Sequence, residues 1–340
     1  MYRTKYVFSS QKKAVLAIRG VLLASALALL SPGAWAANPD VYPSKPVKVI
    51  VPFAPGGGID ILIRAIGNEL SKKWGYPLVV ENKPGASTFI GAESAARSEP
   101  DGYTLFATVD PTFTANRFLF AKMPYDPDRS FAPIMQMVRG DSLLLANPKL
   151  PAADLKELVV LARKQKGKFA YSSFGAGSQP QLTYEYLNTR EGLDLLHVPY
   201  NGITPAMTAA IAGEVQLGVA SAAVAGEMVR GGQLKILAVA GPSRLKQFPD
   251  VKTAAEQGFP YLRASIWYGL FAPAGTPPAL IAKINADVKA VLENPDFSEK
   301  FVTSKGLVVV AGDPVQLSAA IRDDSALIGE MVKAAGVKPE

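Results

Sequence analysis

Three consecutive glycines, Gly56, Gly57 and Gly58, separate an apolar β-branched run from a run with helical spacing. The first run, 47–53, predicts a strand, and the apolar positions within 59–70 predict a helix. Glycine has no Cβ, so the backbone N–H groups of such a loop can approach a ligand closely. Unpaired N–H groups and the dipole of the following helix both favour negative charge. The loop therefore predicts an anion-binding site; a tight strand-to-helix turn with nothing bound is the alternative.

Two later loops have a similar composition. The loop 81–87 contains Pro84-Gly85, an ordinary turn sequence, and we interpret it as mainly structural. The loop 171–178 leaves a predicted strand and enters a predicted helix, and its small residues offer N–H and O–H donors. A ligand site and a capped helix start are both compatible with this pattern. Tyr200 ends a further strand, where its phenol could reach a cleft.

The sequence offers little for catalysis. His197 is the only histidine, there is no cysteine, and no G-x-S-x-G sequence is present. Neither a His-x-x-x-His pair nor a carboxylate cluster indicates a metal site. Both nucleotide-binding patterns are also lacking, because Ile61 stands where G-x-G-x-x-G requires glycine and no G-x-x-x-x-G-K-[ST] occurs. We therefore predict a protein that is not an enzyme and that needs no metal or cofactor.

The first 36 residues have the composition of a secretory signal peptide. Five Lys and Arg residues precede an apolar run at 21–30, and Ala34-Trp35-Ala36 supplies small residues for cleavage. We predict cleavage between Ala36 and Ala37 and a periplasmic mature protein. An N-terminal membrane anchor is the alternative, but the apolar run is shorter than a membrane span. Without those five positive charges the formal net charge of +7 falls to about +2, which does not favour nucleic acid as a partner.

Strands and helices alternate along the rest of the chain with short connections. Beyond the first glycine loop, strands are predicted at 77–82, 103–109, 142–146, 168–173, 193–198, 215–221, 234–240, 267–272 and 307–310, and helices at 90–96, 153–164, 205–212 and 277–292, with further helices from 181 and 314. This alternation predicts α/β architecture with mainly parallel sheets. Around a dozen strands in about 300 residues favour two domains.

Short motifs in a fixed order carry a resemblance to a known family. They are 42–60, which includes the three glycines, then 81–86, 100–105, 124–127, 171–178, 197–200, 271–277 and 333–338. Together they resemble the Bug family, the extracytoplasmic substrate-binding receptors of tripartite tricarboxylate transporters. The resemblance covers the whole mature chain, and the order and spacing of the motifs make it specific.

The resemblance implies the fold of a type II periplasmic binding protein, with two Rossmann-like lobes and a ligand cleft between them. Residues 40–139 plus 262–340 would form lobe 1, and residues 140–261 would form lobe 2. Family members bind small carboxylates, mostly through main-chain and hydroxyl donors, and the lobes close on the ligand. The residues carried over as ligand-binding are Gly56, Gly57 and Gly58 from lobe 1, with Ser173, Phe174, Gly177, Ser178 and Tyr200 from lobe 2.

Three places depart from the family pattern. The strand near 220 often ends in an acidic and then a polar residue, but here it reads Ala220-Ser221. Gln181 replaces a family histidine in the helix after 171–178. The loop 108–113, usually rich in hydroxyl groups and glycine, contains Asp110, which could accept a hydrogen bond from a ligand or repel a dianion. We therefore include Asp110, Ala220 and Ser221 among the predicted ligand-binding residues, as positions that set specificity.

The resemblance and the loops together favour a periplasmic solute-binding receptor. It would capture a small carboxylate, either an aliphatic di- or tricarboxylate or an aromatic carboxylate, for a tripartite tricarboxylate-type transporter. Its partners would be that ligand and the membrane permease subunits, and it would act as a monomer. One alternative is a ligand-sensing receptor that presents its closed form to a membrane sensor kinase. Another is hydrolase or isomerase activity in the cleft, which loss of turnover in His197→Ala would support.

Overall fold

The structure is a computed structural model, and it describes residues 42–175 and 177–339. The predicted signal peptide, residues 1–36, and its cleavage site lie outside the described residues. Among the helices of the described part of the chain, none has both the length and the apolar character needed to cross a membrane.

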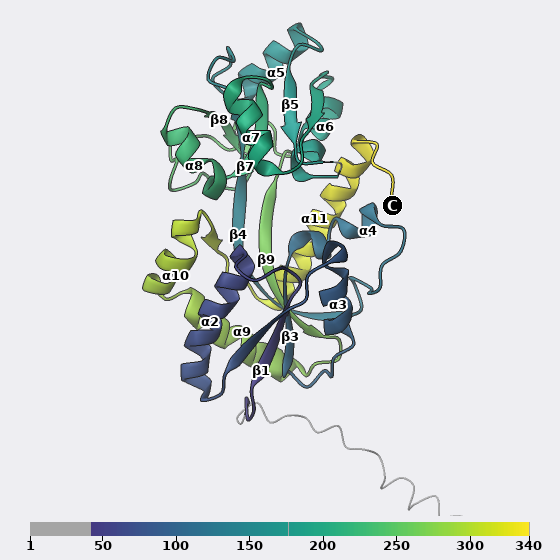
Figure 1. Ribbon diagram of the computed structural model, residues 1–340, viewed down its shortest axis with the longest axis vertical. Coiled ribbons are helices and arrows are strands. Elements are labelled where there is room, and N and C mark those ends of the chain that lie inside the picture. Colours follow the sequence, from purple (N-terminus) through teal and green to yellow (C-terminus); the bar gives the residue numbers. More distant parts are fainter. Residues whose placement is uncertain (1–41, 176, 340) are drawn as a thin grey trace, which may run out of the picture. The chain divides into compact units, whose positions relative to one another are not determined.

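The first group of strands lies at the N-terminal end of the described chain (Figure 1). Strands β1 (Val47–Val51), β2 (Leu78–Asn82) and β3 (Thr104–Val109) pair in parallel in the order β2-β1-β3. Helices α2 (Gly58–Trp74) and α3 (Phe89–Ala96) connect them. Because the strands are parallel, the loops at their carboxyl ends lie at one edge of the sheet, where ligands bind in open α/β sheets.

The second group has the same plan. Strands β5 (Ala170–Ser173), β6 (Leu196–Pro199) and β7 (Leu217–Ser221) form parallel pairs, with β5 between the other two. The helices of this group are α5 (Leu155–Lys164), α6 (Gln179–Glu191), α7 (Ile203–Ala212) and α8 (Ala222–Arg230). Strand β8 (Lys235–Val239) pairs with β4. Apolar clusters pack on both faces of this group, one around Tyr171 and Leu217 and the other around Leu143 and Ala210.

Two long strands connect the groups. Strands β4 (Phe131–Ala146) and β9 (Ser265–Pro273) run side by side and antiparallel, and β4 continues into the second group, where it pairs with β7 (Figure 1). The short strand β10 (Val308–Val309) also pairs with β4 in antiparallel fashion. The prediction of mainly parallel sheets is therefore wrong for these strands. Its basis, alternation of strands with helices, holds only within each group.

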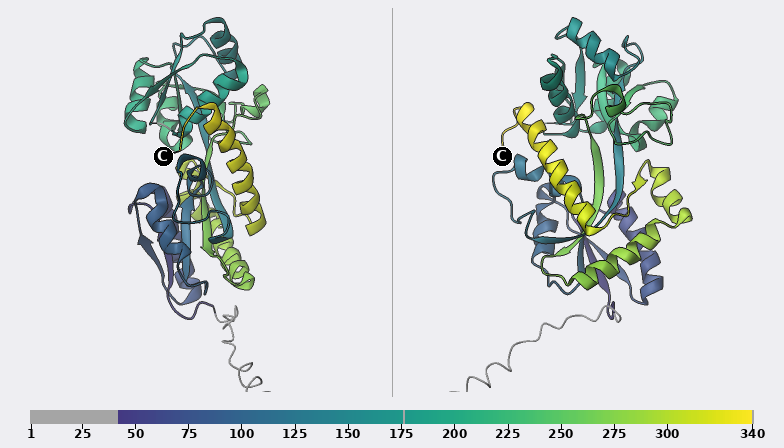
Figure 2. Two further views of the ribbon diagram at one scale, coloured as in Figure 1. Left: turned by 90° about the vertical axis from the view of Figure 1, so that its right-hand side faces the viewer. Right: turned by 180° about the vertical axis from the view of Figure 1, so that it is seen from behind.

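The C-terminal helices complete the fold. Helix α9 (Pro278–Leu292) packs on α2 and is followed by α10 (Pro295–Phe301), whereas α11 (Pro314–Ala334) lies along β4 and reaches α6 of the second group (Figure 2). Helix α11 begins with a capping box, in which the Asp313 carboxylate accepts from the Gln316 N–H at 2.8 Å. Its last turns contact α6 through a shared apolar cluster that includes Leu182, Tyr186 and Met331. The Tyr186 hydroxyl also donates to the Glu330 carboxylate.

Candidate ligand-binding site

A cavity of about 400 Å³ lies at the carboxyl ends of β3, β5 and β7. Elements of both strand groups line it, together with the end of α11. The polar residues among its walls include Asp110, Ser178, Gln179, Ser221, Arg263 and Asp324. The apolar residues include Leu119, Leu182, Ile266, Leu327, Ile328 and Met331. This size and mixture are typical of a site for a small organic ligand.

Three helices of the second group begin at the cavity wall. Ser178 precedes α6, Gly202 precedes α7 and Ser221 precedes α8. Neither serine hydroxyl bonds to the helix that it precedes, and Gly202 has no side chain to do so. The first residues of the helices, or the caps themselves, line the cavity. A helix N-terminus presents unpaired N–H groups and partial positive charge. Three of them on one wall favour an anionic ligand group.

The loop before α6 is held by its own hydrogen bonds. The Gly177 N–H donates to Oε1 of Gln181 at 2.7 Å, and the Ser178 hydroxyl donates to the Gly175 carbonyl at 2.6 Å. Gly177 has a φ of +71°, a backbone conformation that favours glycine, and a Cβ there would also crowd Cδ2 of Leu119 at 3.1 Å. Gln181, the replacement for a family histidine, therefore holds this loop in place.

Buried Ser173 and half-buried His197 form a pair next to this loop. The Ser173 hydroxyl lies 2.6 Å from Nε2 of His197, and the imidazole stacks on the Tyr171 ring at 5.1 Å between centroids. Burial lowers the pKa of His197, although the Glu185 carboxylate opposes this shift. Ser173 is fully buried and does not line the cavity. The pair is placed to support β5 and β6 and not to attack a ligand.

We expect His197→Ala to lower the free energy of unfolding by about 1–3 kcal/mol, because the buried Ser173 hydroxyl loses its shortest hydrogen bond and keeps only the longer contacts with Gly175. Urea unfolding of His197→Ala, Ser173→Ala and the double variant measures this. The effects of the two single variants should be non-additive by about 1 kcal/mol, because each of them removes the same hydrogen bond. Additive effects would show that the pair does not interact.

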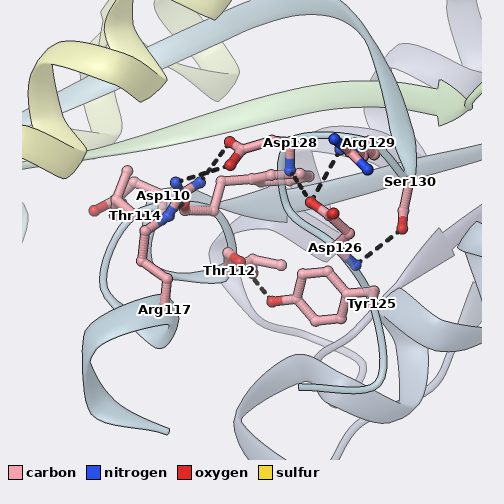
Figure 3. A network of polar contacts seen from close by, with 10 residues as sticks. Asp110, Thr112, Thr114, Arg117, Tyr125, Asp126, Asp128, Arg129 and Ser130 are labelled. Carbon is pink, nitrogen blue, oxygen red and sulfur yellow. Dashed lines mark hydrogen bonds and ion pairs between the residues drawn. The ribbon is translucent and has the colours of Figure 1, made fainter. Parts of the chain in front are cut away.

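The segment after β3 carries Asp110 and is fixed by polar contacts (Figure 3). The Thr114 hydroxyl and the Phe113 N–H both donate to the Asp110 carbonyl at 2.9 Å. The Tyr125 hydroxyl donates to the Thr112 carbonyl at 2.5 Å. Further along, Arg117 forms two hydrogen bonds with the Asp128 carboxylate, at 2.9 and 3.2 Å. The bonds to the Asp110 and Thr112 carbonyls keep Asp110 at the cavity without using its carboxyl group, whereas the Arg117–Asp128 pair lies further along the segment, with Asp128 largely exposed.

The carboxyl groups of Asp110 and Asp324 both accept a hydrogen bond from Trp267. The Trp267 N–H donates to Oδ1 of Asp110 at 3.2 Å, and its indole Nε1–H donates to Oδ2 of Asp324 on α11 at 2.9 Å. Burial, reinforced by the Asp324 charge, raises the pKa of Asp110 to about 8. Burial also raises the pKa of Asp324, against the influence of Arg263 and Arg139.

The first glycine loop has a structural network of its own. The Gly56 N–H donates to Oδ2 of Asp60 at 2.9 Å, and Arg64 and Asn82 also bond to this buried carboxylate. Burial by itself raises the pKa of Asp60, but these hydrogen bonds outweigh it and hold the value below the usual range. A Cβ on Gly58 would lie 2.7 Å from the Tyr268 hydroxyl. Asp60 is therefore structural, as its position at a helix start suggests.

The cavity brings together some of the predicted ligand-binding residues and not others. Those that line it are Asp110, Phe174, Gly177, Ser178, Ala220 and Ser221. Those that do not are Gly56, Gly57, Gly58, Ser173 and Tyr200. Tyr200 packs against an apolar cluster instead, and burial together with the Glu214 carboxylate raises its pKa. The role of every predicted residue in binding stays a prediction.

Sequence reasoning missed the cavity residues contributed by the chain after residue 262. Arg263 lies just before β9, and Asp324, Leu327 and Met331 lie on α11. The helical spacing of these three residues was visible, but nothing in it indicated which surface the helix would cover. Within residues 42–175 and 177–339, no group of three or more His, Asp and Glu side chains is placed to hold a metal ion.

Comparison with known proteins decides the family. The sequence model of the tripartite tricarboxylate transporter family receptor matches residues 62–337. The chain belongs to this family. The receptor is also 31% identical over 325 residues to the protein BugT of Bordetella pertussis (strain Tohama I), which covers 95% of the receptor and 98% of BugT. The Bug resemblance is thereby confirmed, and so is the prediction that the chain is a solute-binding receptor and not an enzyme.

Solved structures agree with the fold. The receptor resembles an R. palustris protein with adipate, with a TM-score of 0.71 and 28% identity over 88% of the receptor and 100% of that chain. It also resembles MatC from Rhodopseudomonas palustris with bound malate, with a TM-score of 0.66 and 33% identity over 86% of the receptor and 100% of that chain. The α/β fold of a periplasmic binding protein is therefore confirmed.

Proposed function

We propose that the receptor captures a small carboxylate in the cavity and delivers it to the permease subunits of a tripartite tricarboxylate-type transporter. The convergence of three helix N-termini on one cavity wall carries this proposal, because their backbone N–H groups favour an anionic group there. Relatives point the same way, since the two solved structures described above contain adipate and malate.

The proposal includes the domain arrangement and the location. Residues 40–139 plus 262–340 form lobe 1, residues 140–261 form lobe 2, and the lobes close about β4 and β9. The pairing of β4 with β9 has register shifts between Pro133 and Met135 and between Gln136 and Val138, where β4 carries one extra residue each time, and such bulges bend a strand locally. The receptor is a periplasmic monomer, released by cleavage between Ala36 and Ala37.

Titration calorimetry of the mature protein against a panel of mono-, di- and tricarboxylates tests the binding step. Amides and alcohols of the same skeletons serve as uncharged controls. We expect at least one carboxylate to bind and its amide to bind about tenfold more weakly or worse. Failure of every carboxylate to bind to folded protein would overturn the proposal.

A matched pair of variants tests whether the cavity wall at which α6, α7 and α8 begin binds the anionic group of the ligand. Ser221→Asp places a carboxylate at the start of α8, where it competes with the ligand, whereas Ser221→Asn caps the helix equally well without charge. We expect Ser221→Asp to weaken carboxylate binding about 100-fold and Ser221→Asn to change it only a few-fold. Equal effects of the two variants would contradict the assignment.

Uptake of the labelled ligand tests the transport step. Deletion of the gene should abolish high-affinity uptake, and a copy encoding the wild-type chain should restore it. Normal uptake in the deletion strain, together with an altered transcriptional response to the ligand, would favour the sensor-kinase alternative and overturn delivery to a permease.

A further inference from the structure

The two sides of the cavity differ in their electrostatic character. The second strand group contributes three helix N-termini, which favour an anion. On the other side of the cavity, the segment after β3 contributes the carboxyl group of Asp110, and α11 contributes that of Asp324. A ligand with negative charge at both ends would place one end against these acids.

Each of the two acids has an oxygen available to a ligand. Trp267 bonds to one oxygen of each, and in the described part of the chain no other residue bonds to Oδ2 of Asp110 or to Oδ1 of Asp324. Neither carboxyl group forms an ion pair with a basic side chain of the described residues. Both side chains are partly buried at the cavity wall, so a ligand that supplies a donor to these oxygens can bind to them directly.

The charged groups around the acids do not neutralise them. Asp324 and Asp323 on α11 add negative charge, and Tyr268 on β9 is a neutral phenol whose pKa is raised by burial and by Asp110. Arg139 on β4 is already paired with Asp141 at 2.8 Å. Arg263 is exposed at the cavity wall and makes no ion pair among the described residues. The raised pKa keeps the Asp110 carboxyl group protonated near neutral pH, and a ligand ammonium group beside it would be balanced by release of that proton.

Much of the remaining cavity wall is apolar. Leu119, Leu182, Leu327, Ile328 and Met331 come from α4 (Asn116–Leu119), α6 and α11 and line one continuous part of it. Several of them belong to the cluster that joins α11 to α6. This surface fits a hydrocarbon group.

We propose that the ligand is a zwitterion with an apolar body, that is, an amino acid with an apolar or aromatic side chain. Its carboxylate lies at the helix N-termini, its ammonium group donates to Asp110 and Asp324, and its side chain contacts the apolar residues of α6 and α11. This inference rests on the proposed carboxylate-binding function and narrows it. Asp110 and Asp324 are then the residues that determine specificity.

Calorimetry with three matched sets tests the proposal. Leucine and phenylalanine are compared with 4-methylpentanoate and 3-phenylpropanoate, which lack the amino group, and with isoamylamine and phenethylamine, which lack the carboxylate. Glutarate and citrate represent the di- and tricarboxylates. We expect one of the amino acids to bind about 50-fold tighter than both of its truncated analogues and than either polyacid. A second readout is the buffer dependence of the binding heat at pH 7, which should show proton release as the ammonium group binds to Asp110.

Variants of the two acids test whether they bind the ammonium group of the ligand. Asp110→Asn and Asp324→Asn should each weaken amino-acid binding about tenfold or more and leave binding of the des-amino carboxylate unchanged or improved. Asp128→Asn, a change to an exposed acid paired with Arg117, is the control and should have no effect. Thermal unfolding confirms that each variant is folded, and the two acid variants provide independent tests.

The outcomes separate the two proposals. Equal or tighter binding of a des-amino carboxylate or a polyacid, with no loss in Asp110→Asn and Asp324→Asn, would overturn the zwitterion assignment and leave carboxylate capture intact. Tight binding of the amine alone, unaffected by Ser221→Asp, would overturn carboxylate capture itself.

Discussion

Replacing Asp110 with asparagine is expected to remove most of the pH dependence of the empty receptor's stability between about pH 4 and pH 8. The pKa of Asp110 is about 8 in the folded protein, whereas an unfolded aspartate titrates near 4. Between these values the folded state holds a proton that the unfolded state has lost, so stability falls as the pH rises. The slope is about 1.4 kcal/mol per pH unit for one such group.

The wild-type chain should therefore lose several kcal/mol, up to about 5, on going from pH 4 to pH 8 through this group alone. Asparagine keeps the acceptor for the Trp267 N–H and cannot ionise, so the variant and the wild type should have similar stability near pH 4. At pH 8 the variant should be the more stable. Urea unfolding at intervals across this range measures the difference.

Asp128→Asn is the matched control, because Asp128 lies in the same segment but is largely exposed, and an exposed ion pair contributes about 1 kcal/mol or less. Asp324 titrates beside Asp110, so Asp324→Asn should reduce the slope further in the double variant. A parallel pH profile for wild type and Asp110→Asn would contradict the assignment of a protonated carboxyl group in the cavity.

Gly241→Ala is expected to destabilise the receptor by about 3 kcal/mol or more. A Cβ on Gly241 would lie 2.2 Å from Cγ of Asp141 and 2.7 Å from its Cβ. The Asp141 side chain is buried and is held by Arg139, with Nε and Oδ1 2.8 Å apart. The new methyl group must displace this carboxylate, which separates a buried charge from its partner.

Urea unfolding again provides the measurement, and Gly57→Ala is the control. The nearest atom to a Cβ on Gly57 is the Ala54 carbonyl oxygen at 3.7 Å, and its φ of −70° suits alanine. Gly57→Ala should therefore leave the free energy of unfolding nearly unchanged. Unfolding of Gly241→Ala at the wild-type urea concentration would show that β4 can shift to accommodate the methyl group.

The elements that sequence reasoning predicted well are those with a local pattern. Helix α2 has buried apolar residues at helical spacing from Ile59 to Leu70, and β1 is a continuous apolar run ending at the glycine loop. In such units the strand, the turn and the helix are encoded within about 30 residues, so long-range contacts are not needed to recognise them.

The first half of β4 was not predicted. Phe131 to Arg139 contains Pro133, Gln136 and Arg139, which interrupt the alternation expected of a strand, and its partner β9 lies more than 120 residues away in the sequence. Helix α8 was missed as well, because its small residues Ala222, Ala223 and Ala225 give little periodic contrast.

The candidate site could be predicted in part. The loop 171–178 and the ends of β3 and β7 were recognisable, because small and polar residues follow an apolar strand there, and residues of all three places line the cavity. The first glycine loop has the same pattern but is pinned by Asp60 and does not line it. Arg263 and Asp324 could not have been found, because only the packing of α11 and β9 brings them to the cavity.

The C-terminal helix has a consequence for attempts to transplant specificity between relatives. Asp324, Leu327, Ile328 and Met331 lie within the last 17 residues of the chain and line the same cavity as the loop 171–178. A chimera that exchanges only the loops at the strand ends would keep the part of the parental ligand surface that α11 contributes. Transfer of ligand specificity from a relative therefore requires that helix α11 be exchanged together with the loops.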